Sequence, residues 1–313
     1  MNNKTLLFVF LALLGIYGLS QVFAGKKSRS FKAELITVDT AAVSSIIINT
    51  KNNEEEVSLR KEDNTWIVSN GAINVRAVPT EVQNLLSSLT LIKSNRIAAK
   101  NEAKWSEFEV GDGQGTRIRV SEGGKQTHDF ILGKFNFNQQ NRTSTAYIRL
   151  AGEKEVYAID GFQTLTLGRG FEAYRNKVLS KMTAEATINT FRFETPDTSY
   201  QFQKTPAGWQ VSTQLPLDSM KVENFLNTLR NLSGHTFADN FDETMAEEKQ
   251  INQLQLEGQG LPDPIIITAY QDTTQAQPFI IHSSLNKGAW FSSDSSGVYS
   301  KIFKTPEAFM QEN

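Results

Sequence analysis

The sequence contains no cysteine among its 313 residues. That absence excludes disulfide bonds, thiolate metal sites, a cysteine nucleophile and a lipid-modified N-terminal cysteine, while it leaves the compartment open. An excess of charge of one sign is also lacking, because 32 basic and 34 acidic residues give a formal net charge of −2. A chain so close to neutral has no general basic field for nucleic acid. We therefore expect no nucleic-acid partner.

Histidine is scarce, with three copies in the chain. His128, His235 and His282 are far apart in sequence, and only His235 has a carboxylate four residues later, at Asp239. In a strand, His128 and Asp129 would point to opposite faces. We interpret all three histidines as structural or surface residues rather than metal ligands or catalytic bases.

Other patterns that can carry chemistry occur only in weak forms. The run Gly111, Gly113 and Gly115 lacks the strand, helix and Lys-Ser/Thr of a phosphate loop, so we read it as a turn. Gly168-Arg169-Gly170 suits a helix break better than an anion site, and the run Glu54-Glu55-Glu56 suits a solvated loop better than a metal site. No serine lies in a G-x-S-x-G elbow. The triplets that begin at Asn141 and Asn231 match the glycosylation sequon, a match common by chance. We predict no catalytic residue, no metal site and no cofactor, and hence no enzyme.

A long apolar run stands near the N-terminus, from Leu6 to Phe23. As a helix it would span about 27 Å, close to the hydrocarbon thickness of a bilayer. We predict a transmembrane signal-anchor helix over residues 6–24, after a short flank at 1–5 and before a tether at 25–40. The lipid bilayer is then a partner through Leu6 to Phe23.

Cleavage after Ala24 is the alternative for this segment, since Val22-Phe23-Ala24 offers small residues where a signal peptidase reads. The apolar run is longer than a usual signal-peptide core, and Lys26-Lys27 follows at once, so we favour the anchor. Two considerations disagree on the orientation of this helix in the membrane. The basic residues after the run favour a cytoplasmic C-terminal part by the positive-inside rule, whereas long domains translocate largely regardless of charge. We expect the C-terminal part outside the cytoplasm.

An internal repeat organises the rest of the chain. Val82–Ala98 and Val222–Ala238 align without a gap at an offset of 140 positions. Each copy carries apolar residues at i, i+3, i+4 and i+7, which predicts one amphipathic helix per copy. Thr80–Gln83 matches a capping box at the start of the first helix, and Asp218 or Ser219 can cap the second. Five positions are identical in the two copies: Val82/Val222, Asn84/Asn224, Leu86/Leu226, Leu89/Leu229 and Ala98/Ala238.

The flanks of the two helices also correspond in order. Both contain a hairpin that leads into a tryptophan, a glycine turn and three short apolar strands. The matched segments are Thr65–Ser69/Gly208–Ser212, Asp112–Gly115/Glu257–Gly260, Phe130–Leu132/Phe279–Ile281, Ala146–Ile148/Ala289–Phe291 and Val156–Tyr157/Val298–Tyr299. We predict an α+β fold made by tandem duplication, with modules at 41–182 and 184–311, each a mainly antiparallel sheet covered by one amphipathic helix. Residues 162–179 would close the first module.

The paired tryptophans, Trp66 and Trp209, allow two interpretations. As core residues, each would pack against the helix that follows it. As an aromatic platform, the pair would hold a sugar or a peptide. Core packing is our interpretation.

Several short motifs together resemble a known family. They comprise an N-terminal apolar helix, an isoleucine-rich strand, a "K…W" hairpin, the V..LL..L helix, a glycine turn, a Phe-Ile-Leu-Gly strand, a Val-Tyr strand and a closing F-x-x-Y-R-x-K segment. The residues of the hairpins and of the closing segment are Lys61 with Trp66, Lys204 with Trp209, and Phe171, Tyr174, Arg175 and Lys177. This pattern resembles the bacterial domain-of-unknown-function family 4340, over most of residues 40 to 310. Two features depart from it: the turn before Arg117 lacks the family's "yGL-x-P" wording, and His282 stands where the first copy has Gly133.

The resemblance implies a membrane-tethered extracytoplasmic protein of the bacterial cytoplasmic membrane, often encoded beside gliding-type ABC transporter components. It supplies no catalytic or ligand residue. We therefore expect a non-enzymatic, membrane-anchored accessory or binding protein, with an ABC transporter membrane subunit as the implied partner. An envelope-polymer enzyme that uses carboxylates and a cleaved, secreted binding protein are the alternatives. A deep pocket lined by titratable groups would favour the enzyme, and an exposed apolar patch would favour the assembly subunit.

Overall fold

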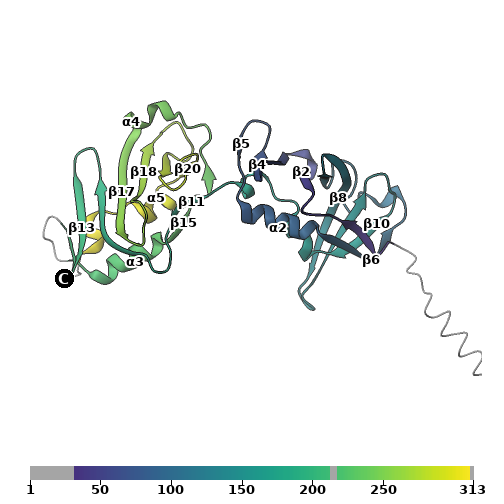
Figure 1. Ribbon diagram of the computed structural model, residues 1–313, viewed down its shortest axis with the longest axis horizontal. Coiled ribbons are helices and arrows are strands. Elements are labelled where there is room, and N and C mark those ends of the chain that lie inside the picture. Colours follow the sequence, from purple (N-terminus) through teal and green to yellow (C-terminus); the bar gives the residue numbers. More distant parts are fainter. Residues whose placement is uncertain (1–31, 212–216, 311–313) are drawn as a thin grey trace, which may run out of the picture. The chain divides into compact units, whose positions relative to one another are not determined.

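A computed structural model describes residues 32–211 and 217–310, and it divides into two compact units between Arg175 and Asn176 (Figure 1). The predicted membrane segment, residues 6–24, lies outside the described residues. No helix within the described ranges is long and apolar enough to cross a membrane. The two units are described one at a time below.

The predicted α+β class, with its transmembrane helix, is wrong for the structure as described. The chain is mostly antiparallel β-sheet, with 46% of residues in strands and 19% in helices, arranged in three sheets. The reason is that the amphipathic helix of each repeat is only 11 residues long. Most of the remaining chain, including segments that the sequence left as polar loops, pairs into strands.

Unit 1 contains a ten-stranded antiparallel sheet in the order β1-β6-β10-β9-β8-β7-β2-β3-β4-β5. Its strands are β1 (Glu34–Thr37), β2 (Val43–Asn49), β3 (Glu56–Glu62), β4 (Thr65–Ser69), β5 (Asn74–Arg76), β6 (Leu91–Ala99), β7 (Thr116–Glu122), β8 (Lys125–Asn138), β9 (Thr143–Leu150) and β10 (Val156–Asp160). The α-helix is α2 (Pro79–Leu89), and the 3-10 helices are η1 (Lys51–Asn53), η2 (Glu102–Lys104), η3 (Phe162–Thr166) and η4 (Phe171–Tyr174).

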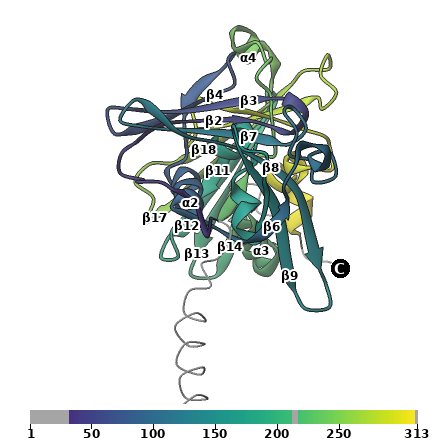
Figure 2. The same ribbon diagram turned by 90° about the vertical axis from the view of Figure 1, so that its right-hand side faces the viewer.

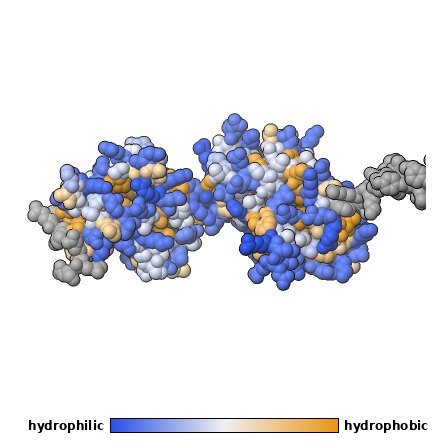
Figure 3. Space-filling model, turned by 90° about the horizontal axis from the view of Figure 1, so that it is seen from below, coloured by the Kyte–Doolittle hydropathy of each residue, from blue (hydrophilic) through white to orange (hydrophobic). Residues whose placement is uncertain are grey.

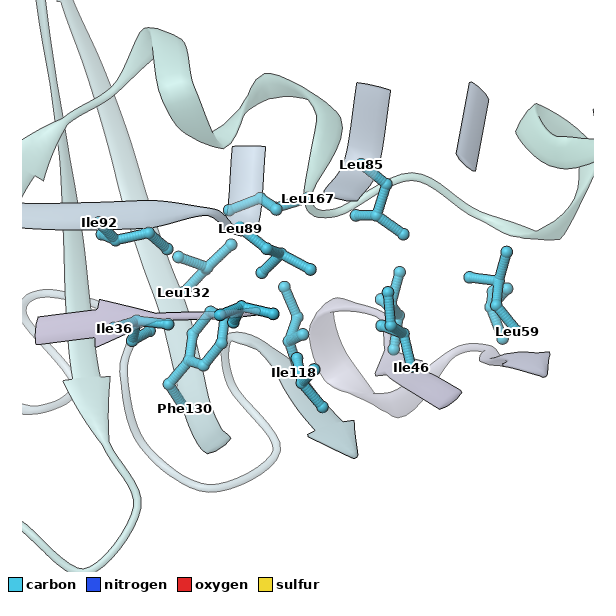
Figure 4. Close-up of a cluster of buried hydrophobic side chains, with 14 of the residues drawn as sticks. Ile36, Ile46, Leu59, Leu85, Leu89, Ile92, Ile118, Phe130, Leu132 and Leu167 are labelled. Carbon is cyan, nitrogen blue, oxygen red and sulfur yellow. The ribbon is translucent and has the colours of Figure 1, made fainter. Parts of the chain in front are cut away.

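The core of unit 1 lies between α2 and the sheet. Alternate residues of the strands point inward, and the helix contributes positions spaced three and four apart, as the two periodicities require. Leu85 and Leu89 of α2 are fully buried. Figure 4 shows these helix side chains facing side chains of the strands, among them Ile46, Leu59 and Phe130.

Unit 2 contains an eight-stranded sheet in the order β14-β13-β12-β17-β18-β19-β20-β16, and a two-stranded sheet of β11 and β15. Its strands are β11 (Val178–Lys181), β12 (Thr187–Glu194), β13 (Ser199–Thr205), β14 (Gly208–Val211), β15 (Asn231–Ser233), β16 (Thr236–Phe237), β17 (Gln250–Gln259), β18 (Ile265–Gln271), β19 (Phe279–Ser283) and β20 (Trp290–Ser293). The helices are α3 (Ser219–Leu229), α4 (Ala246–Lys249), α5 (Val298–Ile302), η5 (Glu243–Met245) and η6 (Pro306–Phe309).

The two units share one strand order. Read from β4, unit 1 runs β4-β3-β2-β7-β8-β9-β10-β6-β1. Read from β14, unit 2 runs β14-β13-β12-β17-β18-β19-β20-β16. In addition, β15 corresponds to the first half of β6, and β11 corresponds to β1. The helices α2 and α3 begin and end at positions offset by 140, as the repeat predicts.

The closing helices correspond as well. The backbone N–H of Val78, just before α2, donates to the carbonyl of Tyr174 at 2.8 Å. The backbone N–H of Asp218, just before α3, donates to the carbonyl of Phe309 at 2.8 Å. In each unit the last 3-10 helix is therefore fastened to the start of the α-helix.

The sequence matches that follow the helices pair segments from strands that do not correspond in the fold. They are shifted by one strand in the shared strand order. Phe279–Ile281 lies in β19, which takes the place of β9 rather than of β8, and Ala289–Phe291 runs into β20, the counterpart of β10. Val298-Tyr299, predicted to be a strand, begins helix α5. The departure that we noted at His282 disappears with this shift, because Gly133 lies in β8.

The boundary between the repeats also falls earlier than predicted. We expected residues 162–179 to close the first module, but Val178 already starts β11, which pairs with β15 in the register in which β1 pairs with β6. The predicted capping box is wrong too. Helix α2 begins at Pro79 after Val78, which offers no side-chain cap.

Candidate functional site

A groove of about 370 Å³ follows one side of α2 in unit 1. Its floor is apolar, and its polar groups are uncharged. Its lining residues are Thr40, Ala41, Trp66, Pro79, Val82, Gln83, Leu86, Ser87 and Thr90. Trp66 is half-buried and packs against the core, so it forms a wall of the groove instead of closing it.

The same place in unit 2 is filled by the protein's own side chains. The helix positions 223, 226, 227 and 230, equivalent to 83, 86, 87 and 90, line a cavity of only about 30 Å³. Lys204 also lines it. The sheet residue that corresponds to Trp66 is Trp209, which is 4% exposed and belongs to the core, as predicted.

Three groups converge beside that small cavity. The Glu223 carboxylate accepts a hydrogen bond from the Lys204 ammonium at 2.7 Å and from the Trp209 indole N–H at 2.9 Å. The Lys204 nitrogen also lies 5.7 Å from the centre of the Trp209 ring, within cation–π range. The hydrogen bond from Lys204, with help from Trp209, holds the pKa of Glu223 below its ordinary value.

Unit 1 keeps the cross-strand pairing of this lysine and tryptophan but lacks the carboxylate. Lys61 and Trp66 face each other across β3 and β4, as Lys204 and Trp209 do across β13 and β14. The position of Glu223 is held by Gln83. Within residues 32–211 and 217–310, neither the Lys61 ammonium nor the Trp66 indole N–H has a hydrogen-bond or ionic partner.

A second feature of unit 1 is an exposed apolar surface, which we call the hairpin patch. It consists of Phe135 and Phe137 on β8 with Phe162 and Leu165 on η3. Their exposed fractions are 41%, 49%, 49% and 56%. Phe135 and Phe137 are two residues apart on one strand face, and Phe162 and Leu165 are three apart in a 3-10 helix, so each pair points one way.

Contacts join the two halves of the hairpin patch. The rings of Phe137 and Phe162 meet edge to face with centres 5.9 Å apart. The Phe135 ring lies against Gly161, where an added Cβ would approach it to 2.8 Å. Figures 1 and 2 show the β8–β9 hairpin projecting from the body of unit 1. Figure 3 shows apolar areas interrupting an otherwise hydrophilic surface.

A third feature is a polar depression of about 290 Å³ in unit 1, lined in part by His128, Asp129 and Glu153. Its charged groups are already engaged. Arg117 holds Asp129 with two hydrogen bonds, at 2.9 and 2.7 Å, and Tyr157 donates to Glu153 at 3.0 Å. Burial, followed by the hydrogen bond to Glu153, raises the pKa of the Tyr157 hydroxyl well above its ordinary value.

Comparison with known families gives one result for this chain. A model described as "Domain of unknown function (DUF4340)" matches residues 68–254, more than half of the chain. The chain belongs to the DUF4340 family. Comparison with curated proteins and with solved structures gives no match. The DUF4340 match begins in β4, contains both amphipathic helices and ends in β17.

The histidines of this DUF4340 chain lie in unlike surroundings. His128 is 3.8 Å from the carboxylate of Glu122, and His235 is exposed on the loop between β15 and β16. His282 stacks on Trp290 and contacts the Lys287 carbonyl at 3.2 Å. In the two described ranges no three His, Asp or Glu side chains are grouped as a metal site would need.

The remaining candidates have structural surroundings. An added Cβ at Gly115 would lie 2.3 Å from the Leu132 carbonyl, so this turn allows close backbone packing. Arg169 pairs with Glu81 at 2.7 Å, and Glu55 accepts the backbone N–H of Phe171. The sequon asparagine Asn141 lies in the β8–β9 turn, and Asn231 lies in β15; both are exposed.

Sequence reasoning missed the buried charge of Arg149. Arg149 is 3% exposed, donates to the Val110 carbonyl at 2.8 Å and to Asp112 at 2.6 Å, and lies 3.8 Å from the centre of the Trp105 ring. This group pins the 101–115 loop to β9. The hairpin patch was missed as well, although Phe135-Asn136-Phe137 alternates apolar and polar residues as an exposed strand does.

Proposed function

We propose that the protein is a non-enzymatic accessory subunit of a membrane assembly and that the hairpin patch of unit 1 is its docking surface. The observation that carries this proposal is a group of four exposed apolar side chains, Phe135, Phe137, Phe162 and Leu165, from two elements that touch through the rings of Phe137 and Phe162. Scattered apolar residues are normal on a protein surface, but grouped aromatic residues are typical of interfaces.

The surroundings of the hairpin patch favour a protein partner. The tip of the hairpin carries uncharged amides, namely Asn136, Asn138, Gln139, Gln140 and Asn141. Its only charged residues are Lys134 and Arg142. An apolar centre with a hydrogen-bonding rim fits a protein interface, whereas an anionic lipid surface is met by clusters of basic residues.

The N-terminal sequence supports placement of this surface near a membrane. Residues 24–31 separate the apolar run from the start of the described chain. Eight residues reach at most about 28 Å when fully extended. If the run Leu6–Phe23 lies in a bacterial cytoplasmic membrane, unit 1 stays close to its outer surface, where confinement raises the effective concentration of a neighbouring subunit. An ABC transporter membrane subunit is the partner that the family resemblance suggests.

The test is affinity purification of the full-length chain from solubilised membranes, with identification of co-purifying membrane subunits. Phe137→Asp should remove the transporter-type subunit from the eluate, because a charge would then replace the ring that meets Phe162 in the hairpin patch. Met220→Asp is the matched control, since Met220 is a lone apolar residue, 73% exposed, in unit 2. An equal loss in both variants, or full recovery of the subunit with Phe137→Asp, would contradict the proposal.

Two further measurements separate the alternatives. A mature N-terminus at Gly25 would replace the membrane-anchored form by a secreted binding protein. Hydrolysis of an envelope polymer by the purified chain, abolished by a carboxylate substitution, would replace the accessory subunit by an enzyme.

A further inference from the structure

We propose that the groove of unit 1 binds an acidic peptide segment of a partner protein, whose carboxylate takes the place that Glu223 holds in unit 2. This inference rests on the comparison of the two repeats. It does not depend on the membrane placement or on the hairpin patch.

Both units contain a cross-strand lysine–tryptophan pair, and unit 2 shows which group binds to it. One carboxylate, that of Glu223, accepts from both Lys204 and Trp209. Such charge-assisted hydrogen bonds are shorter and stronger than neutral ones. The lysine–tryptophan pair of unit 2 therefore binds an anion between an ammonium group and an indole N–H.

Unit 1 presents the same two donors without the anion. The cross-strand pair Lys61/Trp66 and the helix position 83 match Lys204/Trp209 and 223 in register. Gln83 is exposed and uncharged, and Glu81, two residues nearer the start of α2, is already paired with Arg169 at 2.7 Å. No acidic residue lines the groove. Trp66 lines the groove and Lys61 is its cross-strand neighbour, so a carboxylate that binds at Trp66 would lie next to one positive charge and one N–H donor that is unpaired within the described ranges.

The rest of the groove indicates that the carboxylate belongs to a peptide with apolar neighbours. Beyond Trp66, the floor consists of Ala41, Pro79, Val82 and Leu86. A volume of about 370 Å³ lies at the lower end of the range for small-ligand pockets and accommodates a few side chains. Unit 2 excludes such a segment, because its equivalent cavity is reduced to about 30 Å³.

The occupant is thus an extended segment with an acidic residue between apolar ones. Its carboxylate accepts from Lys61 and Trp66, and an apolar side chain lies over Val82 and Leu86. Gln83 would donate its amide N–H to the same carboxylate or to the peptide backbone.

The experiment follows the tryptophan indole N–H signals of the full-length, ¹⁵N-labelled chain in detergent by NMR. Four tryptophans give four signals, and Trp66→Phe assigns the one of interest. The probes are two peptides, N-acetyl-Leu-Glu-Leu-amide and its isosteric control N-acetyl-Leu-Gln-Leu-amide. We expect the Glu peptide to shift the Trp66 signal until the site is saturated. We expect the affinity of the Gln peptide to be lower by a factor of about five or more.

Variants make the test specific. Gln83→Glu supplies an internal carboxylate, so the free variant should already show a displaced Trp66 signal and should no longer respond to the Glu peptide. Lys61→Met should reduce the affinity for the Glu peptide to that for the Gln peptide. Glu223→Gln is the matched control: it should displace the Trp209 signal and leave the Trp66 response unchanged.

Three results would overturn the proposal. They are equal binding of both peptides, an undiminished response in Gln83→Glu, and no shift of the Trp66 signal by the Glu peptide up to about 10 mM. Full recovery of the transporter-type subunit with Phe137→Asp would contradict the proposed function but would leave this peptide result unchanged, so the two proposals fail separately.

Discussion

The residues that precede α2 and α3 can be exchanged to measure how much an N-cap hydrogen bond stabilises each helix. Asp218 accepts the backbone N–H groups of Met220 at 2.8 Å and of Lys221 at 3.3 Å. Val78 precedes α2 with nearly the same backbone, at φ −67°, ψ 118° against φ −84°, ψ 104°, but it has no acceptor. Asp218→Ala leaves two N–H groups of the first turn without their partner. This should cost about 1 kcal/mol, within the range of about 0.5–2 kcal/mol for N-cap losses.

The reverse change should stabilise unit 1. Val78→Asp places an acceptor and a negative charge at the N-terminus of α2, a gain of about 1 kcal/mol. Val78 is half-buried, so removal of its methyl groups offsets part of this gain. We expect a net gain of about 0.5 kcal/mol.

The assay must report the units separately, because a chain with two compact units need not unfold in one step. Hydrogen exchange at increasing urea concentration, read by mass spectrometry, assigns the protection to peptides from β2 of unit 1 or from β12 of unit 2. With an m-value of about 2 kcal/mol/M, 1 kcal/mol moves the midpoint by about 0.5 M. Asp218→Asn is the control, since it keeps an oxygen acceptor and should cost only a few tenths of a kcal/mol.

Two outcomes would refute this reasoning. If Asp218→Asn destabilised unit 2 as much as Asp218→Ala, the loss would not come from the missing acceptor. If the unit 1 peptides lost protection in Asp218→Ala, the effect would not be local to α3.

Three other predictions concern stability and use the same assay. Leu226→Ala, at a buried site, should cost about 2–5 kcal/mol in unit 2, whereas Leu86→Ala in the open groove should cost less than half as much in unit 1. Glu223→Gln should lower the free energy of unfolding by at most about 0.5 kcal/mol at pH 7, since the side chain is 44% exposed. Because the pKa of Glu223 is lowered in the folded state, this loss of stability is complete above the ordinary pKa of 4.5 and disappears as the pH falls through the lowered pKa. Gly258→Ala would place a Cβ 2.0 Å from the Thr187 carbonyl and should cost about 1–3 kcal/mol, while Gly288→Ala meets no atom within 4 Å and should be near neutral.

The helices were the most predictable part of the fold. The offset of 140 places α2 and α3 correctly, because an apolar stripe spaced at three and four residues is specific to a helix. The ends were less predictable. Thr80 and Gln83 had the right chemistry for a cap, but Pro79 takes the first helical position and moves the start two residues earlier.

The later strands were mispaired because short apolar runs resemble one another. Phe279–Ile281 is as similar to β8 as to β9 in composition, and only backbone pairing decides between them. The loops before β7 and β17 also differ in length, so the offset that works for the helices fails beyond them. Val298-Tyr299 illustrates the usual ambiguity between a strand and a short helix.

The candidate site was only partly visible in the sequence. The exchange of Glu223 for Gln83 can be read from the repeat alignment. The sequence also indicates the hairpin that contains Lys61 and Trp66. It does not specify that this hairpin lies beside position 83 of α2, which is a tertiary contact. The hairpin patch depends on η3 lying against β8, a tertiary contact between segments without any shared motif.

The bond between each closing 3-10 helix and the start of its α-helix has a consequence for synthesis. Unit 1 cannot close until Tyr174 has left the ribosome, because its carbonyl receives the N–H of Val78. Residues 176–313 then take about 7–28 s to be made at 5–20 residues per second, ample time for a domain to fold first. Two sheets with one strand order are liable to exchange strands with each other while both are unfolded. Completion of the first before the second emerges keeps the strands of each repeat with their own sheet.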